Sequence, residues 1–140
     1  MMIRKNFVRV GIGCMILKDG KVLLGKRKGA HGAGEYAWPG GHLELGETIE
    51  KCVERETKEE TGMKVKAIKF LCVSNIIKYE KHYIDIQILT KHISGHPKVT
   101  EPHKIESWNW YSLDKLPKPM FEMSKRAVTA YKTGRYYFPK

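Results

Sequence analysis

Three glutamates that could bind a metal ion stand where a helix would normally carry apolar side chains. Ile49 and Val53 recur at helical spacing and define one apolar stripe, because each residue of a helix advances by about 100°. The same rotation places Glu56 and Glu60 on this stripe and Glu59 at its margin. The segment therefore predicts a helix whose inward face ends in carboxylates.

These inward carboxylates need a positive partner. Side chains at i, i+3 and i+4 of a helix crowd together, and an uncompensated buried charge is strongly destabilising. Hard oxygen ligands without a neighbouring Cys or His suit Mg²⁺ or Mn²⁺. The alternative is a helix rich in solvated ion pairs, and the favourable pair Glu54 and Lys58 does fall on the opposite face. The alignment of Glu56 and Glu60 with the apolar stripe favours the metal site.

The glutamates belong to a longer pattern of fixed spacing. It reads G-x5-E-x7-R-E-x-x-E-E-x-G and consists of Gly41, Glu47, Arg55, Glu56, Glu59, Glu60 and Gly62. This pattern resembles the Nudix box of the Nudix hydrolases, and Met63 meets its closing apolar position. Thr57 departs from the box, which usually has a bulky aliphatic residue there, but threonine is small enough to pack at this place.

The resemblance implies a role for most residues of this pattern. It makes the three glutamates catalytic residues and ligands of Mg²⁺, with Mn²⁺ as the alternative, and it adds a backbone carbonyl at Gly41 to the ligand set. Glu47 and Arg55 form the pair that holds the preceding loop against the helix. Glu56 or Glu60 then takes a proton from the attacking water through the metal shell.

Candidates outside the box supply a further acid and the phosphate contacts. In the family an additional acid often completes the metal set or acts as the base, and here the candidates are Glu106 and Glu101, of which we favour Glu106. Arg27 and Lys26 end an expected strand and could contact the substrate phosphates. We expect Glu106 to act together with the three box glutamates.

An aromatic side chain and a glycine-rich loop complete the candidate site. Phe121 or Tyr36 could stack on the base of a nucleotide. The loop 29–34, GAHGAG, could approach phosphate closely, because glycine permits close backbone contact with a ligand. It lacks the Lys-Ser/Thr ending of a P-loop, so we expect a plain flexible loop.

The length and charge of the chain narrow the class of protein. Its 140 residues suit one compact domain. Lys and Arg outnumber Asp and Glu by 26 to 15, for a net charge of +11. Seven of the acids lie in the box region: Glu44, Glu47, Glu50, Glu54, Glu56, Glu59 and Glu60. A basic surface around an acidic pocket suits a polyanionic substrate, although it equally suits weak nucleic-acid binding or solubility alone.

The cysteines and the N-terminal segment indicate the cellular compartment of the protein. Cys14, Cys52 and Cys72 are isolated, odd in number and set among apolar residues, which is typical of buried thiols in a reducing, cytoplasmic setting. The N-terminal segment MMIRKNF lacks the apolar stretch of an export signal, and no run approaches the length of a membrane span. We expect a cytoplasmic protein without a membrane partner.

The order of elements predicts a layered α/β fold. The expected strands are 7–17, 21–28, a short segment within 36–41, 65–78, 82–92 and 106–111, and the expected helices are 49–61 and 120–132. Asp19-Gly20 predicts a hairpin between the first two strands. This order resembles the Nudix-type α/β/α sandwich with a mixed sheet. The aromatic tail 135–139 could pack on the domain or form a homodimer contact.

The resemblance implies Mg²⁺-dependent hydrolysis of a nucleoside diphosphate linked to another group. The leading substrate is a nucleoside triphosphate, converted to the monophosphate and pyrophosphate, as in relatives of the MutT type. RNA 5′-caps, nucleotide sugars and dinucleoside polyphosphates are alternative substrates within the family, and nucleic acid is a possible but not favoured partner. The alternative of another class is a non-catalytic nucleotide-sensing module. The presence of all the box acids argues against that module.

Overall fold

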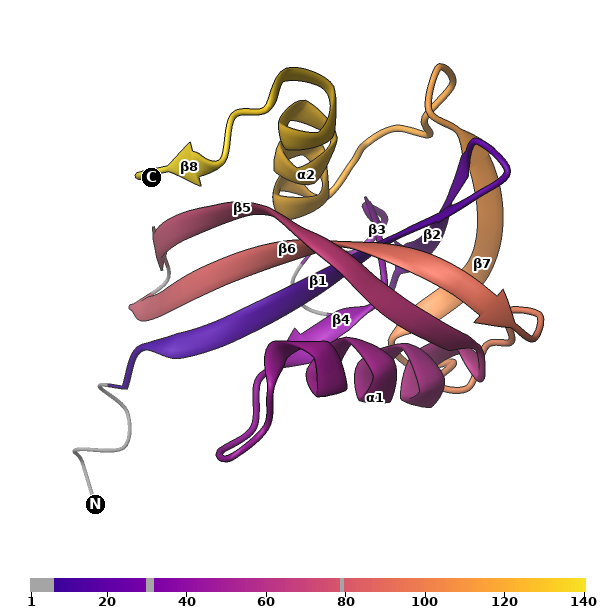
Figure 1. Cartoon of the computed structure of the whole chain (residues 1–140), viewed down its shortest axis with the longest axis horizontal. Helices are drawn as coiled ribbons and strands as arrows, with labels where there is room; N and C mark the ends of the chain where they lie inside the picture. Colours follow the sequence, from indigo (N-terminus) through magenta and orange to yellow (C-terminus); the bar gives the residue numbers. More distant parts are fainter. Residues whose placement is uncertain (1–6, 30–31, 79) are drawn as a thin grey trace.

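The computed structural model describes residues 7–29, 32–78 and 80–140. Over these residues a mixed eight-stranded sheet lies between two helices, one on each face (Figure 1). The strands are β1 (Arg9–Lys18), β2 (Lys21–Arg27), β3 (Tyr36–Ala37), β4 (Gly40–His42), β5 (Lys64–Lys78), β6 (Lys81–Ser94), β7 (Ile105–Ser112) and β8 (Tyr137–Phe138), and the helices are α1 (Ile49–Thr61) and α2 (Glu122–Thr133). The predicted α/β/α sandwich with a mixed sheet is confirmed.

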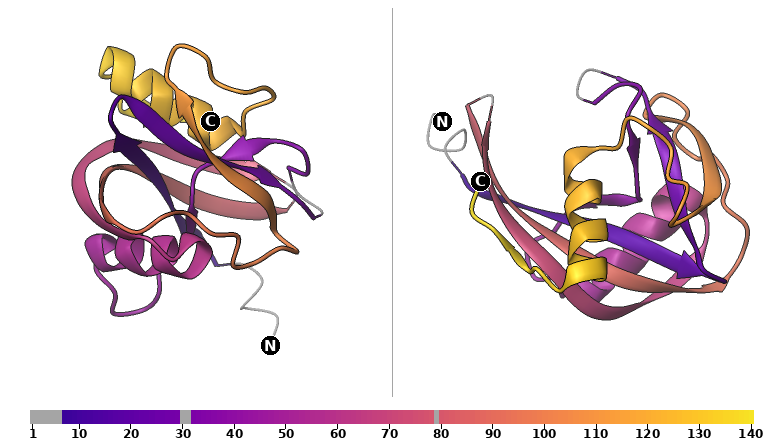
Figure 2. Two further views of the ribbon diagram at one scale, coloured as in Figure 1. Left: turned by 90° about the vertical axis from the view of Figure 1, so that its right-hand side faces the viewer. Right: turned by 90° about the horizontal axis from the view of Figure 1, so that it is seen from above.

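Strand β1 organises the sheet, and the sheet divides along one of its edges. On one side β1 pairs in parallel with β6 along nearly its whole length. On the other side it pairs with β2 only at Leu17 and Lys18, and with β4 from Gly11 to Gly13. Strands β2 and β7 therefore curve away from β5 and β6 (Figure 2). The predicted hairpin is confirmed at its Asp19-Gly20 turn, but the two strands then separate.

Side chains of β1 alternate between two hydrophobic clusters. Ile12 and Cys14 belong to the cluster on the α1 side of the sheet, whereas Met15 belongs to the cluster on the α2 side. Successive side chains of a strand point to opposite faces, so each face continues along the strand in steps of two residues. On the α2 side the two positions before Met15 are Gly13 and Gly11, and the hydrophobic cluster stops there.

Helix α1 begins and ends where the sequence predicts. Thr48 caps its N-terminus, because its hydroxyl accepts a hydrogen bond of 3.1 Å from the backbone N–H of Lys51. Gly62 ends the helix in the left-handed conformation with φ of 77°. Thr57, the departure from the box pattern, is fully buried together with Thr61. The smaller residue is therefore accommodated inside the protein.

The remaining expectations have mixed outcomes. Strands β5 and β6 pair in antiparallel fashion, and Cys14, Cys52 and Cys72 are free and buried as predicted. The short segment within 36–41 forms two strands, β3 and β4. The expectations for residues 1–6 and for 30–31 of the glycine-rich loop lie outside the described residues. No helix in the described part of the chain has the length and apolar character needed to cross a membrane.

The C-terminal tail packs on the domain and forms a strand that the sequence did not predict. Strand β8 pairs in parallel with β5 at Val73 and Ser74. Phe138 is buried in the α2-side cluster, with the guanidinium of Arg135 4.1 Å from its ring centroid. The neighbouring Tyr137 is 56% exposed.

The tail should therefore stabilise the fold through one side chain. We expect Phe138→Ala to lower the free energy of unfolding by about 2–4 kcal/mol, because it removes a buried aromatic ring. Tyr137→Ala is the matched control and should change it by less than about 1 kcal/mol. Urea unfolding followed by circular dichroism measures both, and equal losses would contradict the packing role of Phe138.

Candidate active site

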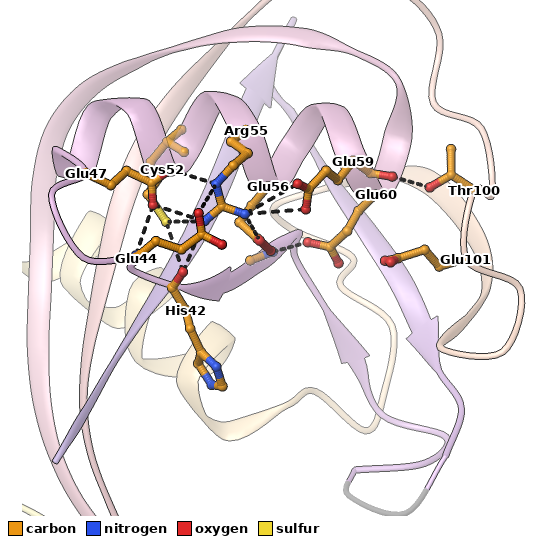
Figure 3. Close-up of polar contacts among 12 residues, drawn as sticks. His42, Glu44, Glu47, Cys52, Arg55, Glu56, Glu59, Glu60, Thr100 and Glu101 are labelled. Atoms are coloured by element: carbon orange, nitrogen blue, oxygen red, sulfur yellow. Dashed lines mark hydrogen bonds and ion pairs between the residues drawn. The ribbon is translucent and has the colours of Figure 1, made fainter. Parts of the chain in front are cut away.

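Arg55 of α1 connects the helix to the loop before it. Its Nε and Nη2 donate hydrogen bonds of 2.6 Å and 3.0 Å to the two carboxylate oxygens of Glu47, and Nη2 also donates to the carbonyl of His42 at 3.1 Å (Figure 3). The adjacent guanidinium lowers the pKa of Glu47 to about 2. The predicted contact between Glu47 and Arg55 is thus present, and it ties the segment after β4 to the helix.

The same guanidinium also holds two of the helix glutamates. Nη1 of Arg55 donates to Glu56 at 2.6 Å and lies 3.4 Å from a carboxylate oxygen of Glu59. The side chain of Glu56 is 13% exposed, whereas that of Glu59 is 54% exposed. In this arrangement the acids are spread along the helix, and no three His, Cys, Asp or Glu side chains among the described residues converge as a ready-made metal site.

Glu60 is the more deeply buried acid of the helix. One carboxylate oxygen accepts a hydrogen bond of 2.8 Å from the backbone N–H of Gly40, and the indole N–H of Trp108 donates to the Glu60 carbonyl at 3.1 Å. Burial raises the pKa of Glu60 to about 8, and the nearby carboxylates of Glu56 and Glu101 add to this effect. A cation bound beside this carboxyl would offset the cost of ionising it.

Gly40 and Gly41 bring the backbone of β4 close to these acids. A Cβ atom built on Gly41 would lie 1.8 Å from Oε2 of Glu56, and one built on Gly40 would lie 2.3 Å from the carbonyl oxygen of Ile12. The backbone of β1 leaves no room for a side chain at Gly40, whereas a side chain at Gly41 would have to displace the carboxylate of Glu56. The Gly-Gly pair therefore lets the strand pass directly beside Glu56.

The donor set fits a hard divalent cation. The acidic groups gathered around Arg55 are the carboxylates of Glu44, Glu47, Glu56 and Glu59, and Glu60 lies close enough to Glu56 to be affected by its charge. A single guanidinium leaves this group with excess negative charge, and burial makes that charge costly at Glu60. Carboxylate oxygens without a thiolate suit Mg²⁺ or Mn²⁺. Glu56 and Glu60 of this group are partly buried, and the chemistry of their oxygen donors is compatible with such an ion.

The structure changes our preference for the additional acid. Glu106 lies on the solvent side of β7, where its carboxylate is 3.7 Å from the ammonium of Lys26. Its neighbours Ile105 and Trp108 are buried, whereas the side chain of Glu106 is 52% exposed. Glu101 instead acts electrostatically on Glu60, and Figure 3 shows its carboxylate turned towards that residue.

A cavity of about 730 Å³ adjoins the acids. Its lining shows which of the residues predicted to contact phosphate or the base lie near them. Arg27, Glu60 and Phe121 line it. The guanidinium of Arg27 lies over the Phe121 ring, 4.4 Å from the centroid. Lys26 and Tyr36 are not among the lining residues. Of the residues predicted to contact phosphate or to stack on a base, Arg27 and Phe121 therefore lie in the cavity.

Sequence reasoning missed the polar residues on the floor of this cavity. Asp85 and Gln87 of β6 line it, together with Trp38 and with Ser124 of α2. Burial raises the pKa of Asp85 to about 6. The available signal was the segment YIDIQIL, in which two polar residues share one face of an otherwise apolar strand.

Comparisons with known proteins agree with the box pattern. A family model described as the NUDIX domain matches residues 7–131. The ADP-ribose pyrophosphatase of Methanocaldococcus jannaschii is 38% identical over 118 residues, which make up 83% of this chain and 69% of that protein. The oxidized purine nucleoside triphosphate hydrolase of Danio rerio is 31% identical over 110 residues, or 74% of this chain and 65% of that protein. The chain thus spans only part of the length of both relatives.

A solved structure extends the likeness to the fold. The crystal structure of a MutT NUDIX hydrolase from Burkholderia pseudomallei matches with a TM-score of 0.80 and 36% sequence identity. The match covers 89% of this chain and 98% of that chain. Similarity in sequence and in backbone therefore extends well beyond the box into the strands that line the cavity.

The buried carboxyl of Asp85 should lower stability at neutral pH. Its folded-state pKa of about 6 lies above the ordinary value near 3.9, so the folded protein holds an extra proton between these pH values and loses stability as the pH rises through them. We expect Asp85→Asn to match the wild type near pH 3 and to be more stable by about 1–2 kcal/mol at pH 7.5.

Urea unfolding at the two pH values tests this expectation. Asp114→Asn, on an exposed loop, is the control and should show no pH-dependent difference from the wild type. A variant at Asp85 that is less stable than the wild type at pH 7.5 would contradict the interpretation.

Proposed function

Because the chain belongs to the Nudix hydrolase family, we propose that it hydrolyses a phosphoanhydride bond in a nucleoside diphosphate linked to another group. The substrate we propose first is a nucleoside triphosphate, cleaved to the monophosphate and pyrophosphate. The observation that carries this proposal is that Glu60 and Arg27 line the same cavity. An acid suited to a metal ion and a cation suited to phosphate are thereby available to one substrate.

The proposed metal ligands are Glu56, Glu59, Glu60 and the backbone carbonyl of Gly41. Mg²⁺ is the proposed ion and Mn²⁺ the alternative, on the basis of the oxygen donors. When bound, such an ion would neutralise charge on the phosphate oxygens and make an attacking water more acidic. Arg55 limits the repulsion between Glu56 and Glu59 before the ion and the substrate arrive.

Glu60 and the residues around the metal ligands are proposed to accept the proton of water, to contact the phosphates and to contact the base. One oxygen of Glu60 is held by the N–H of Gly40, so the other oxygen is available to accept a proton from water in the cavity. Glu101 replaces Glu106 as the proposed additional acid. Arg27 would contact the phosphates, and Phe121 beneath it would contact the base or ribose. Exclusion of water by these walls would strengthen each charged contact.

A nucleotide sugar is the second candidate substrate. The relative from Methanocaldococcus jannaschii is named for ADP-ribose, in which a ribose replaces the outer phosphate as the group attached to the nucleoside diphosphate. The same acids and the same arginine would serve this reaction. RNA 5′-ends remain a further possibility, and the net charge of +11 predicts that such an activity would fall steeply with rising salt.

Glu60→Gln tests the hydrolytic role. We expect it to lower kcat/KM by at least about 100-fold, because the amide is a poorer metal ligand and cannot accept the proton. Pyrophosphate and phosphate release with Mg²⁺, from a panel of nucleoside triphosphates and ADP-ribose, measures the loss. Glu54→Gln, on the solvent side of the same helix, is the control and should keep activity near that of the wild type. Unchanged activity in Glu60→Gln would rule out the proposed site.

Arg27 and Lys26 form a matched pair for the phosphate contact. Arg27→Gln should lower kcat/KM by about 10-fold or more, chiefly through KM, because a charged hydrogen bond to phosphate is lost. Lys26→Gln removes an equal charge outside the cavity and should change kcat/KM by less than about 2-fold. Steady-state kinetics on the preferred substrate compares them, and equal effects would indicate general electrostatic attraction instead of a specific contact.

A further inference from the structure

Asp85 and Gln87 form a polar floor in the cavity. They occupy alternate positions of β6, so both side chains lie on the face that continues to Leu89 and the α2-side hydrophobic cluster. Gln87 is 3% exposed, and burial disfavours the charged form of Asp85. Both groups are hydrogen-bonded, but the desolvated carboxyl of Asp85 keeps acceptor capacity that a ligand in the cavity can use.

Two glycines of β1 make room for this pair. The parallel register places Gly11 beside Asp85 and Gly13 beside Gln87. A Cβ atom built on Gly13 would lie 2.3 Å from the amide of Gln87, and one built on Gly11 would lie 3.3 Å from Oδ2 of Asp85. The amide of Gln87 therefore lies across the backbone of β1, in space that any other residue at position 13 would fill.

Trp38 fixes the direction of the hydrogen bonds along this floor. Its indole N–H can only donate, and it donates to Oε1 of Gln87 at 3.0 Å. The amide nitrogen of Gln87 then faces Asp85 and donates to Oδ1 at 2.6 Å. Within the described part of the chain these are the hydrogen bonds found for the two side chains. Oδ2 of Asp85, a second acceptor site on Oδ1 and the second N–H of Gln87 remain for a ligand.

The nearby cation on α2, Arg126, is only partly engaged, because its Nη1 is buried without a hydrogen-bond partner among the described residues. Arg126 lines the cavity and acts electrostatically on Asp85, but its Nε donates to Glu122 at 3.1 Å and its Nη2 donates to the carbonyl of Lys140 at 3.0 Å. It therefore moderates the charge of Asp85 without forming a hydrogen bond to it among the described residues. The carboxylate is left as an acceptor facing the cavity.

We propose that Asp85 is a specificity-determining residue that selects guanine nucleotides, by accepting hydrogen bonds from the ring N1–H and the 2-amino group. The remaining N–H of Gln87 would donate to O6. Among the common bases, the Watson–Crick edge of guanine alone presents two adjacent donors beside an acceptor. Adenine and cytosine present one amino donor beside a ring acceptor, and uracil presents one N–H between two carbonyls. A carboxylate beside an amide donor therefore complements guanine best.

This inference rests on the proposed function for its setting, because Glu60 and Arg27 line the same cavity as Asp85. A nucleotide whose base contacts Asp85 would have its phosphates in the same cavity as Glu60 and Arg27. The cavity volume of about 730 Å³ lies in the range of small-molecule sites. A site built to pair with a donor rejects an analogue that lacks the donor more strongly than an apolar pocket does.

GMP and IMP provide a sharp test, because they differ only in the 2-amino group. We expect the wild type to bind GMP at least about 10-fold more tightly than IMP or AMP in isothermal titration calorimetry with Mg²⁺ present. In Asp85→Asn the ratio of GMP to IMP affinity should fall below about 3-fold. Asp114→Asn, which changes an exposed carboxylate in the same way, should keep the preference of the wild type.

Binding of monophosphates separates this inference from the proposed hydrolysis. Equal affinity of the wild type for GMP and IMP, or an unchanged preference in Asp85→Asn, would overturn the role of Asp85 even if triphosphates are hydrolysed. A guanine preference that disappears in Asp85→Asn would support that role even if no substrate is hydrolysed, and that absence of hydrolysis would count against the proposed function alone. Unfolding curves of the same variant confirm that a lost preference does not come from a lost fold.

Discussion

The candidate site depends on Arg55, because its guanidinium reaches four carboxylates, those of Glu44, Glu47, Glu56 and Glu59, that would otherwise repel one another. Two of its nitrogens hold Glu47, and a third contacts Glu56 and approaches Glu59. The pair with Glu47 also fixes the loop after β4 against the start of α1. A lysine could not hold the same geometry, since it lacks the planar fork of donors that meets a carboxylate with two parallel bonds.

The division of the sheet explains how a helix on one face contributes to a cavity on the other. Strand β1 passes from β4 to β2 along a single edge, and the strands on that edge do not form one continuous layer. Glu60 of α1 lines the cavity that Asp85 and Ser124 also line, although α1 and α2 cover opposite faces. Gly40 and Gly41 occur at this division, where the backbone of β4 passes between β1 and Glu56.

Much of the fold and the acidic part of the site could be predicted because they depend on short-range patterns. The spacing from Gly41 to Gly62 determines the helix, its caps and the contact of Glu47 with Arg55. The choice between Glu106 and Glu101 could not be made from the sequence, because it depends on which carboxylate lies near Glu60, and Glu101 comes from a loop far from α1 in the chain. Strand β8 depends on pairing with a segment far away in the chain, which no local pattern contains. The polar residues of the floor were visible in the segment YIDIQIL, but their position beside Gly11 and Gly13 depends on the pairing of β6 with β1.

The separation of the floor from the acids has an evolutionary consequence. Asp85 and Gln87, which are proposed to hydrogen-bond the base, lie on β6, whereas the proposed metal ligands lie on α1 and the adjoining β4. Substitutions at positions 85 and 87 can therefore alter the shape and polarity of the floor while the hydrogen bonds of Arg55 stay intact. Enzymes of this architecture can therefore change their nucleotide specificity through substitutions in β6 alone, with the catalytic helix unchanged at every step.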